Sequence, residues 1–304
     1  MTLKYIKYTI AILLVIVTLA LSYIAIWAKF VREYDISTYT PFRTTKHRNW
    51  LISFAGGEVH ESNQNYLHSA SINRGFKVII DYGINDVDKT YIKKHKEIFS
   101  QKRGSGYWLW KPYIIDKTLT MMNYGDILFY VDSGVVILEN TDFFTDKMDE
   151  DKSDILLFKS FHKNRRFTKR DTYSMMGADE KYAQHPQFGA TIVIVRKTDR
   201  SIKFIKEWMR YCENPKLLTD EPSKKEEYPD FIEHRHDQSI LTMLYYKDPA
   251  KITIMDYHAK GICEKFFHHR RRTHFPMLLI NKLKLFIDTC DTKSMIEACG
   301  GGDV

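Results

Sequence analysis

An aspartate directly after a strongly apolar run is the first residue whose position could do chemistry. Asp132 follows that run in YVDSG, residues 130–134. A carboxylate at the end of a buried strand is costly to desolvate unless a cation or hydrogen-bond donors face it. Gly134, two residues later, would let a ligand approach the backbone. The spacing fits a ligand for a metal ion or a sugar nucleotide, and equally an aspartate that caps a turn.

A second segment combines glycines, cations and aromatic rings. RGSGYWLWKP, residues 103–112, holds two glycines, the cations Arg103 and Lys111, and three aromatic residues just before a predicted helix. Backbone amides at a helix N-terminus favour anions, and aromatic faces can stack on a base or a sugar. The segment therefore indicates either an anion-binding loop or a packed loop whose aromatic residues belong to the core.

A third segment, HRHDQ at residues 234–238, opens a predicted helix. In one interpretation Asp237 is its N-cap. In the other, His234 or His236 lies with Asp237 in a cleft, as metal ligand, acceptor contact or general base. Two histidines in an HxH pattern are a weak zinc signal, because no third ligand has suitable spacing.

The distribution of charge excludes one class of partner. The formal net charge is +8, from 46 lysines and arginines against 38 acids, yet residues 265–284 hold six of those basic residues and no acid. A nucleic-acid footprint over the whole surface is therefore not expected. The basic segment fits a solvated or lipid-facing patch, or a contact to a diphosphate. A charged triplet, Lys169 to Asp171, lies in a predicted polar loop.

Composition and missing motifs narrow the class further. With 304 residues, 44% of them hydrophobic, the chain can bury a sizeable core, which excludes general disorder. The four cysteines form no CxxC pair, and Cys290 with Cys299 could close a small loop or stay free thiols. We find no GxSxG, P-loop, strand-linked GxGxxG or HExxH motif. Hydrolases of the α/β type, P-loop NTPases, dinucleotide oxidoreductases and zincins are therefore disfavoured.

The elements that must position these residues alternate between apolar strands and helices. Strands are predicted at 50–56, 76–83, 126–138 with a break at 133–134, 154–160 and 190–197. Helices are predicted at 61–73, 87–99, 109–122, 201–212 and 237–246. This pattern predicts an α/β domain with a mostly parallel central sheet flanked by helices. Ligands bind such sheets at the carboxyl ends of the strands, where Asp132 lies.

An uncharged run of twenty residues, 9–28, is long enough to span a membrane as a helix. We predict a tail at 1–8, a single transmembrane anchor at 9–28 and a polar stalk at 29–48. The alternatives are a signal peptide cleaved near 20–22 and a buried core helix. The flanking lysines and arginines lean towards a cytosolic domain, and a lumenal domain of type II remains open.

Five segments in order carry a resemblance to a known family. The segments are RGSGYWLWKPYII (103–115), GDILFYVDSG (125–134), KRD (169–171), QFGATIVIVRK (187–197) and HRHDQSIL (234–241). Together they resemble the nucleotide-diphospho-sugar glycosyltransferases of the GT-A fold, over about residues 50–270. The resemblance implies a Rossmann-like sheet that binds a sugar nucleotide, with an acceptor across the cleft. It places a catalytic domain at 49–275 and a C-terminal extension at 276–304.

The resemblance also implies roles for residues. Asp132 matches the first carboxylate of the DxD motif, but Gly134 stands at the second position, which leaves Mn²⁺ or Mg²⁺ dependence open. Asp132 and His236 are the candidate metal ligands, and Asp237, His236 and Asp132 the candidate catalytic residues. Asp171 and Gln238 are expected on the acceptor side. The expected donor contacts are Arg103, Gly106, Tyr107, Trp108, Lys111, Asp132, Lys169, Arg170, His268, His269 and Arg270.

We therefore predict a membrane-anchored, hexosyltransferase-like enzyme that moves a sugar from a nucleotide-diphospho-sugar to a glycan, lipid or protein acceptor. The main alternative is a non-catalytic module that binds sugar nucleotides or glycans and has a degenerate metal site, which the glycine at position 134 motivates. A basic protein that binds nucleic acid or acidic lipid is the least favoured class, and no nucleic-acid partner is expected.

Overall fold

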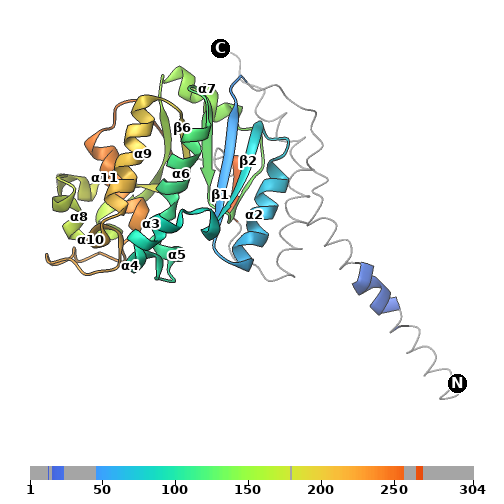
Figure 1. The fold of residues 1–304 in the computed structure, drawn as a ribbon, viewed down its shortest axis with the longest axis horizontal. Coiled ribbons are helices and arrows are strands. Elements are labelled where there is room, and N and C mark those ends of the chain that lie inside the picture. The colour runs from blue at the N-terminus through green and yellow to red at the C-terminus, as the bar shows by residue number, and fades with distance from the viewer. Residues whose placement is uncertain (1–12, 14–15, 24–45, 179, 257–264, 270–304) are drawn as a thin grey trace, which may run out of the picture. The chain divides into compact units, whose positions relative to one another are not determined.

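The structure is a computed structural model (Figure 1), and it describes residues 13, 16–23, 46–178, 180–256 and 265–269. Contacts divide the chain into two units, Ser37–His269 and a second made of Met1–Ile36 with Arg270–Val304. Of the second unit, the described residues are helical and exposed. No helix among the described residues is both long and apolar enough to cross a bilayer. Most of the predicted anchor at 9–28 lies outside them.

A six-stranded sheet forms the centre of the larger unit, with strand order β2-β1-β3-β6-β5-β7. Strand β6 runs antiparallel to both of its neighbours, and the other three pairings are parallel. The predicted mostly parallel sheet is therefore confirmed, with one reversed strand inside it. The strands are β1 (Asn49–Ala55), β2 (Phe76–Gly83), β3 (Ile127–Val131), β5 (Ile155–Lys163), β6 (Pro186–Arg196) and β7 (Ile252–Asp256).

Helices cover both faces of this sheet, with α6, α9 and α11 on one side and α2 on the other (Figure 1). Alternate residues of a strand point to opposite faces, so Ile52 belongs to one core layer and Leu51 to the other. The longer helices are α2 (Glu58–Ser71), α6 (Trp110–Met121), α7 (Asp142–Glu150), α9 (Asp199–Cys212) and α11 (His236–Lys247). The β-branched strands and amphipathic helices thus produce a three-layer α/β/α domain.

Several elements differ from the prediction. The helix expected over 87–99 is two short helices, α3 (Lys89–Lys94) and α4 (Lys96–Phe99), because His95 leaves the helical conformation between them. Asp88 caps the first through the amides of Thr90 and Tyr91. The charged triplet expected in a loop instead enters a helix, α8 (Arg170–Met175). Short elements that the pattern did not predict are α5 (Gly104–Tyr107), α10 (Pro215–Leu218), β7 and β8 (Phe267–His269).

The break predicted at 133–134 separates β3 from β4 (Val135–Ile137). The chain leaves the large sheet at Asp132, turns, and pairs β4 antiparallel with β8 in a separate two-stranded sheet. The turn is closed by a hydrogen bond from the amide of Val135 to the carbonyl of Asp132. Asp132 therefore lies where the buried strand ends, at the carboxyl edge of the parallel strands.

Candidate active site

Three elements bring one lysine and two aspartates together. Lys111 lies in the first turn of α6, Asp132 follows β3, and Asp237 lies in the first turn of α11. The Lys111 Nζ atom is 2.9 Å from Asp237 Oδ2 and 3.4 Å from Asp132 Oδ1. We call these three residues the ion triad.

The ion triad is buried except at Asp132. The side chains of Lys111 and Asp237 are 4% and 5% exposed, whereas that of Asp132 is 33% exposed. The Lys111 ammonium also donates to the carbonyl of Ala190 at 3.1 Å. The Tyr130 hydroxyl donates to Asp132 Oδ1 at 2.5 Å. Asp132 is therefore held on one side by the protein and reaches solvent on the other.

Burial and charge act against each other in the ion triad. Burial alone would lower the pKa of Lys111, but Asp132 and Asp237 raise it above the ordinary value. Burial raises the pKa of Asp237 to about 6, although Lys111 opposes the rise. Burial and Asp132 raise the pKa of Tyr130 well above its usual range. Lys111 is therefore charged, and Tyr130 keeps the proton that it donates to Asp132.

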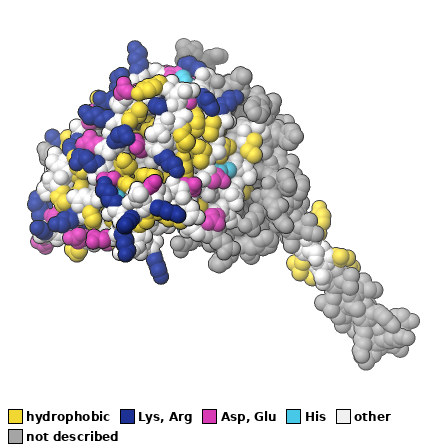
Figure 2. Space-filling model, in the orientation of Figure 1, with side chains coloured by type: hydrophobic (Ala, Val, Ile, Leu, Met, Phe, Trp, Pro, Cys, Tyr) yellow, Lys and Arg dark blue, Asp and Glu magenta, His cyan; other side chains and the backbone are white. Residues whose placement is uncertain are grey.

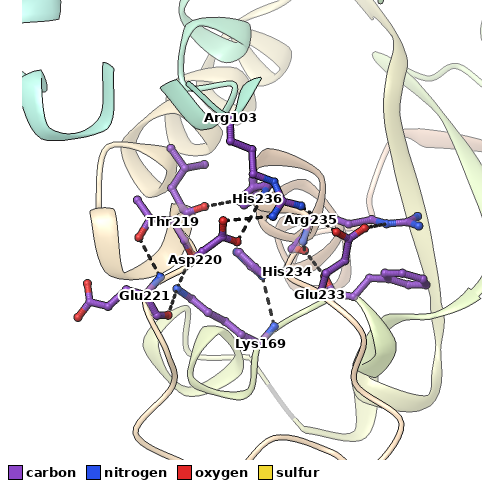
Figure 3. A network of polar contacts seen from close by, with 12 residues as sticks. Arg103, Lys169, Thr219, Asp220, Glu221, Glu233, His234, Arg235 and His236 are labelled. Carbon is purple, nitrogen blue, oxygen red and sulfur yellow. Dashed lines mark hydrogen bonds and ion pairs between the residues drawn. The ribbon is translucent and has the colours of Figure 1, made fainter. Parts of the chain in front are cut away.

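A second buried polar group lies beside the start of α11 (Figure 3). The His234 Nε2–H donates to the Leu217 carbonyl at 2.7 Å, and its Nδ1 accepts the backbone amide of Lys169 at 3.3 Å. The Lys169 ammonium donates to the carbonyls of Thr219 and Glu221 at 2.8 and 2.9 Å. We call His234, His236 and Lys169 the histidine cluster. Its members are paired mainly with backbone groups.

His236 is neutral and confined. Its Nδ1–H donates to the Leu218 carbonyl at 2.7 Å, and its ring stacks on Trp108 with centroids 5.3 Å apart. Burial lowers the pKa of His236 to about 4, so Nε2 carries a lone pair near neutral pH. That nitrogen makes no hydrogen bond among the described residues, and Asp220 Oδ1 lies 3.7 Å away. The backbone of His236 is left-handed, with φ +47°.

The glycine-rich segment forms a left-handed turn against this histidine. All five residues from Gly104 to Trp108 have positive φ, between 50° and 97°. The amides of residues 105–109 donate to carbonyls of the same segment or of residues 101–103. A Cβ on Gly104 would lie 2.4 Å from the Trp108 ring, and one on Gly106 would lie 3.0 Å from Phe99. The two glycines are therefore required by the conformation of the turn. The amides of residues 105–109 already donate to carbonyls of the protein, so they are not free for an anion.

Arg103 and Arg170, two further cations that were expected to contact the sugar-nucleotide donor, are paired with acidic side chains. Arg103 contacts Asp220 at 3.2 Å and Glu233 at 2.8 Å, and its side chain is 43% exposed (Figure 3). Arg170 donates to Glu180 at 3.3 Å. On the face in Figure 2, basic and acidic side chains are interspersed. These residues lie at the surface with their charges compensated.

The two residues expected on the acceptor side have structural partners. Asp171 accepts the amides of Lys224 and Lys225 at 2.7 and 3.2 Å, which orders that loop. Gln238 accepts the amide of Ala190 at 3.3 Å and donates to Gln187 at 2.6 Å. Gln238 therefore ties α11 to β6, one residue from the ion triad.

Other expected contacts lie on the small second sheet or outside the described residues. His268 and His269 belong to β8 and pair with Val136 and Val135 of β4. Arg270 lies outside the described residues, as do Cys290 and Cys299. Cys212, at the end of α9, is a buried free thiol. Burial raises the pKa of that thiol well above its usual range, so it is not a reactive thiolate.

A divalent metal does not fit between Asp132 and His236. Among the described residues, no group of three or more histidine, cysteine, aspartate or glutamate side chains could hold an ion. Asp132 Oδ1 already accepts from Tyr130 and faces Lys111, and the Nδ1–H of His236 is bound to a carbonyl. The donor set is thus one carboxylate oxygen beside an ammonium.

Sequence reasoning missed Tyr130 and Asp220. Tyr130 precedes Asp132 by two positions, and strand alternation puts residues i and i+2 on the same side, a signal that could have found it. Asp220 follows α10 in a segment without periodicity, so no signal pointed to it. It joins Arg103 to the edge of His236.

Comparisons with known proteins give only distant similarities to solved structures. No family model matches the sequence, and no curated protein matches it. A glycosyltransferase involved in glycosylation of the major capsid of PBCV-1 is 10% identical, with TM-score 0.43, over 74% of this chain and 96% of that one. Mouse xyloside xylosyltransferase 1 is 11% identical, with TM-score 0.41, over 69% and 86%. The bifunctional glycosyltransferase WbbM is 11% identical, with TM-score 0.42, over 78% and 44%. Identities and TM-scores this low do not assign the chain to a family.

Proposed function

We propose that this protein transfers a sugar from a nucleotide-diphospho-sugar donor. The observation that carries the proposal is the ion triad at the end of β3, in which Asp132 alone is substantially exposed. Ligands of open α/β sheets bind outside the carboxyl ends of the strands. The five segments that resemble GT-A glycosyltransferases include all three members of the ion triad.

The chemistry assigns different tasks to the two aspartates. Sugar transfer develops positive charge on the sugar ring and negative charge on the departing diphosphate. Asp132 is the carboxylate that a substrate reaches, so we assign donor binding to it. Asp237, predicted as general base, has a raised pKa suited to proton transfer but a side chain only 5% exposed. We assign Asp237 to holding Lys111.

The cellular setting of this activity is part of the proposal. The uncharged run at 9–28 supports a single N-terminal membrane anchor. The acceptor would be a glycan, lipid or protein on the membrane face that is supplied with nucleotide sugars. The basic run at 268–272 supports a contact to phosphate or to anionic lipid.

Asp132→Ala tests the proposal most directly. The full-length wild-type chain and the variant would be incubated with a panel of UDP- and GDP-sugars, with release of free nucleoside diphosphate as the readout. We expect turnover in the wild type to fall at least ~100-fold in the variant, as when one group that stabilises the transition state is lost. Asp146→Ala, at an exposed position on α7, is the matched control and should keep full turnover.

Wild-type turnover in Asp132→Ala would contradict the assignment of Asp132. Failure of the wild type to hydrolyse or transfer any donor in the panel would contradict the transferase itself. Circular dichroism of both variants shows whether the fold is retained, which we expect because Lys111 keeps Asp237 as its partner.

One observation favours the alternative of a non-catalytic binding module. Lys111 pairs with both carboxylates inside the protein, as in a purely structural ion network. Calorimetry with the same donors separates the two functions. Binding without product formation, lost in Asp132→Ala, would establish the module.

A further inference from the structure

We propose that Lys111 is the resident cation of this site and that Asp132 binds sugar or ribose hydroxyls without a divalent metal ion. The catalytic part of this inference rests on the proposed function. The statement about metal binding stands on the geometry of the ion triad.

The first step is the count of donors on Lys111. An ammonium has three N–H groups, and three acceptors surround this one: the Ala190 carbonyl, Asp237 Oδ2 and Asp132 Oδ1. Only the Ala190 contact is a hydrogen bond, and the two carboxylates lie at ion-pair distance. Lys111 therefore faces three acceptors of the protein itself instead of the phosphate that it was expected to contact. Its position is fixed from three sides, and it acts through Asp132.

The second step concerns the oxygens of Asp132. Oδ1 accepts the Tyr130 hydroxyl at 2.5 Å and faces the ammonium at 3.4 Å. A metal ion on that oxygen would have to displace the Tyr130 proton. It would also lie beside a buried positive charge, and like charges repel strongly where water is excluded. Oδ2, with no such partner among the described contacts, remains for a ligand.

The third step considers ligands that could complete a metal site. Asp237 is bound to the far side of Lys111 and is buried. His236 presents a bare Nε2, but its ring is packed against Trp108 and Tyr107 and is 2% exposed. Hard cations require several oxygen ligands. Among the described residues, the site thus offers a metal ion one oxygen of Asp132, which suits a hydroxyl donor and falls short of what a divalent cation needs.

Direct measurement of metal binding tests this inference without any activity assay. Electron paramagnetic resonance would follow Mn²⁺ added to the full chain, alone and with UDP or GDP, up to ~1 mM, the weak end of protein cation sites. We expect no bound Mn²⁺ that depends on Asp132, so wild type, Asp132→Asn and the surface control Asp146→Asn should give the same signal. A Mn²⁺ signal present in wild type and Asp146→Asn but lost in Asp132→Asn would overturn the proposal.

A second variant tests the stated cause. Lys111→Met with Asp237→Asn removes one positive and one negative charge together, so that no buried carboxylate is left beside a missing lysine. Asp132 then loses its ammonium, and we expect affinity for Mn²⁺ to rise at least ~10-fold. No rise in a variant that melts cooperatively would show that Lys111 is not what excludes the metal.

Activity distinguishes this inference from the proposed function. If donor turnover is found, EDTA should change its rate less than ~2-fold, since the cation of the site is covalently part of the chain. Loss of turnover in EDTA, restored by Mn²⁺, would overturn Lys111 as the resident cation. Absence of all turnover would count against the transferase, while the Mn²⁺ measurement would still decide the metal question.

Discussion

The ion triad and the histidine cluster are two buried polar groups that meet at the start of α11, yet they are stabilised by different means. In the ion triad a charged lysine is paired with two carboxylates. In the histidine cluster, His234, His236 and Lys169 are paired chiefly with backbone carbonyls, and the histidines are neutral. Consecutive residues, His236 and Asp237, thus enter opposite electrostatic environments.

The difference shows how the first turn of α11 takes part in two separate polar groups. The ion pairs of Lys111 hold Asp132 where it meets solvent. In the histidine cluster, two neutral rings and the Lys169 ammonium hold the end of α10 and the residues up to Glu221 through backbone carbonyls. Because the groups differ in charge, they respond differently to substitution and to pH. The predictions below use those responses, from the largest expected effect to the smallest.

Replacing the lysine of each group in turn should give the largest difference in stability between the ion triad and the histidine cluster. Lys111→Met leaves two carboxylates without their cation and should lower the free energy of unfolding by about 3–5 kcal/mol. Lys169→Met leaves only the carbonyls of Thr219 and Glu221 without a donor and should lower it by about 1–3 kcal/mol. Urea unfolding at pH 7 measures both. Equal losses of unfolding free energy in the two variants would contradict the proposed difference between ion pairing and carbonyl pairing.

Acid should weaken the histidine cluster. The pKa of His236 is lowered from 6.5 to about 4, so its contribution to stability is complete above pH 6.5 and is lost as pH falls through 4. Relative to His236→Asn, which keeps a donor and tolerates positive φ, the wild type should lose about 3–4 kcal/mol between pH 7 and pH 3. Unfolding curves across this range provide the test. A constant difference between the proteins would mean that His236 is not buried as a neutral ring.

A rise in pH through the acidic range should lower the free energy of unfolding through Asp237. Its pKa is raised from 3.8 to about 6, so the protonated form is favoured in the folded state. The associated stability is complete below pH 3.8 and is lost as pH rises through 6. Relative to Asp237→Asn, the wild type should lose about 3 kcal/mol between pH 3.5 and pH 7. A difference that grows with pH instead would show that Lys111 dominates the burial of Asp237.

Parts of this architecture follow from local patterns in the sequence. The alternation of apolar strands and helices predicted the layered sheet, and the end of β3 placed Asp132 at its carboxyl edge. Asp237 at a helix start was predicted for the same local reason. Local pattern does not report that Lys111, 21 positions before Asp132 and 126 before Asp237, lies between them. That pairing arises only when α6 and α11 pack on the same face of the sheet.

The left-handed backbone of the glycine-rich segment and the tautomer of His236 could not be predicted from the sequence either. Glycine-rich sequence suggested amides open to an anion, but Ser105, Tyr107 and Trp108 share the left-handed conformation with the glycines. Non-glycine residues adopt it only where packing compensates, so periodicity gives no signal. The tautomer of His236 depends on the Leu218 carbonyl, which α10 places there.

The left-handed turn has a consequence for the cooperativity of the fold. Each non-glycine residue in that conformation costs roughly 1–2 kcal/mol, and the turn has three. Opening the segment releases this strain, so the free energy of local unfolding there is lowered relative to the neighbouring helix α6. We therefore expect the amides of residues 105–109 to exchange hydrogen with solvent before those of the core do. The stacking of Trp108 on His236 links this segment to the helix that carries Asp237.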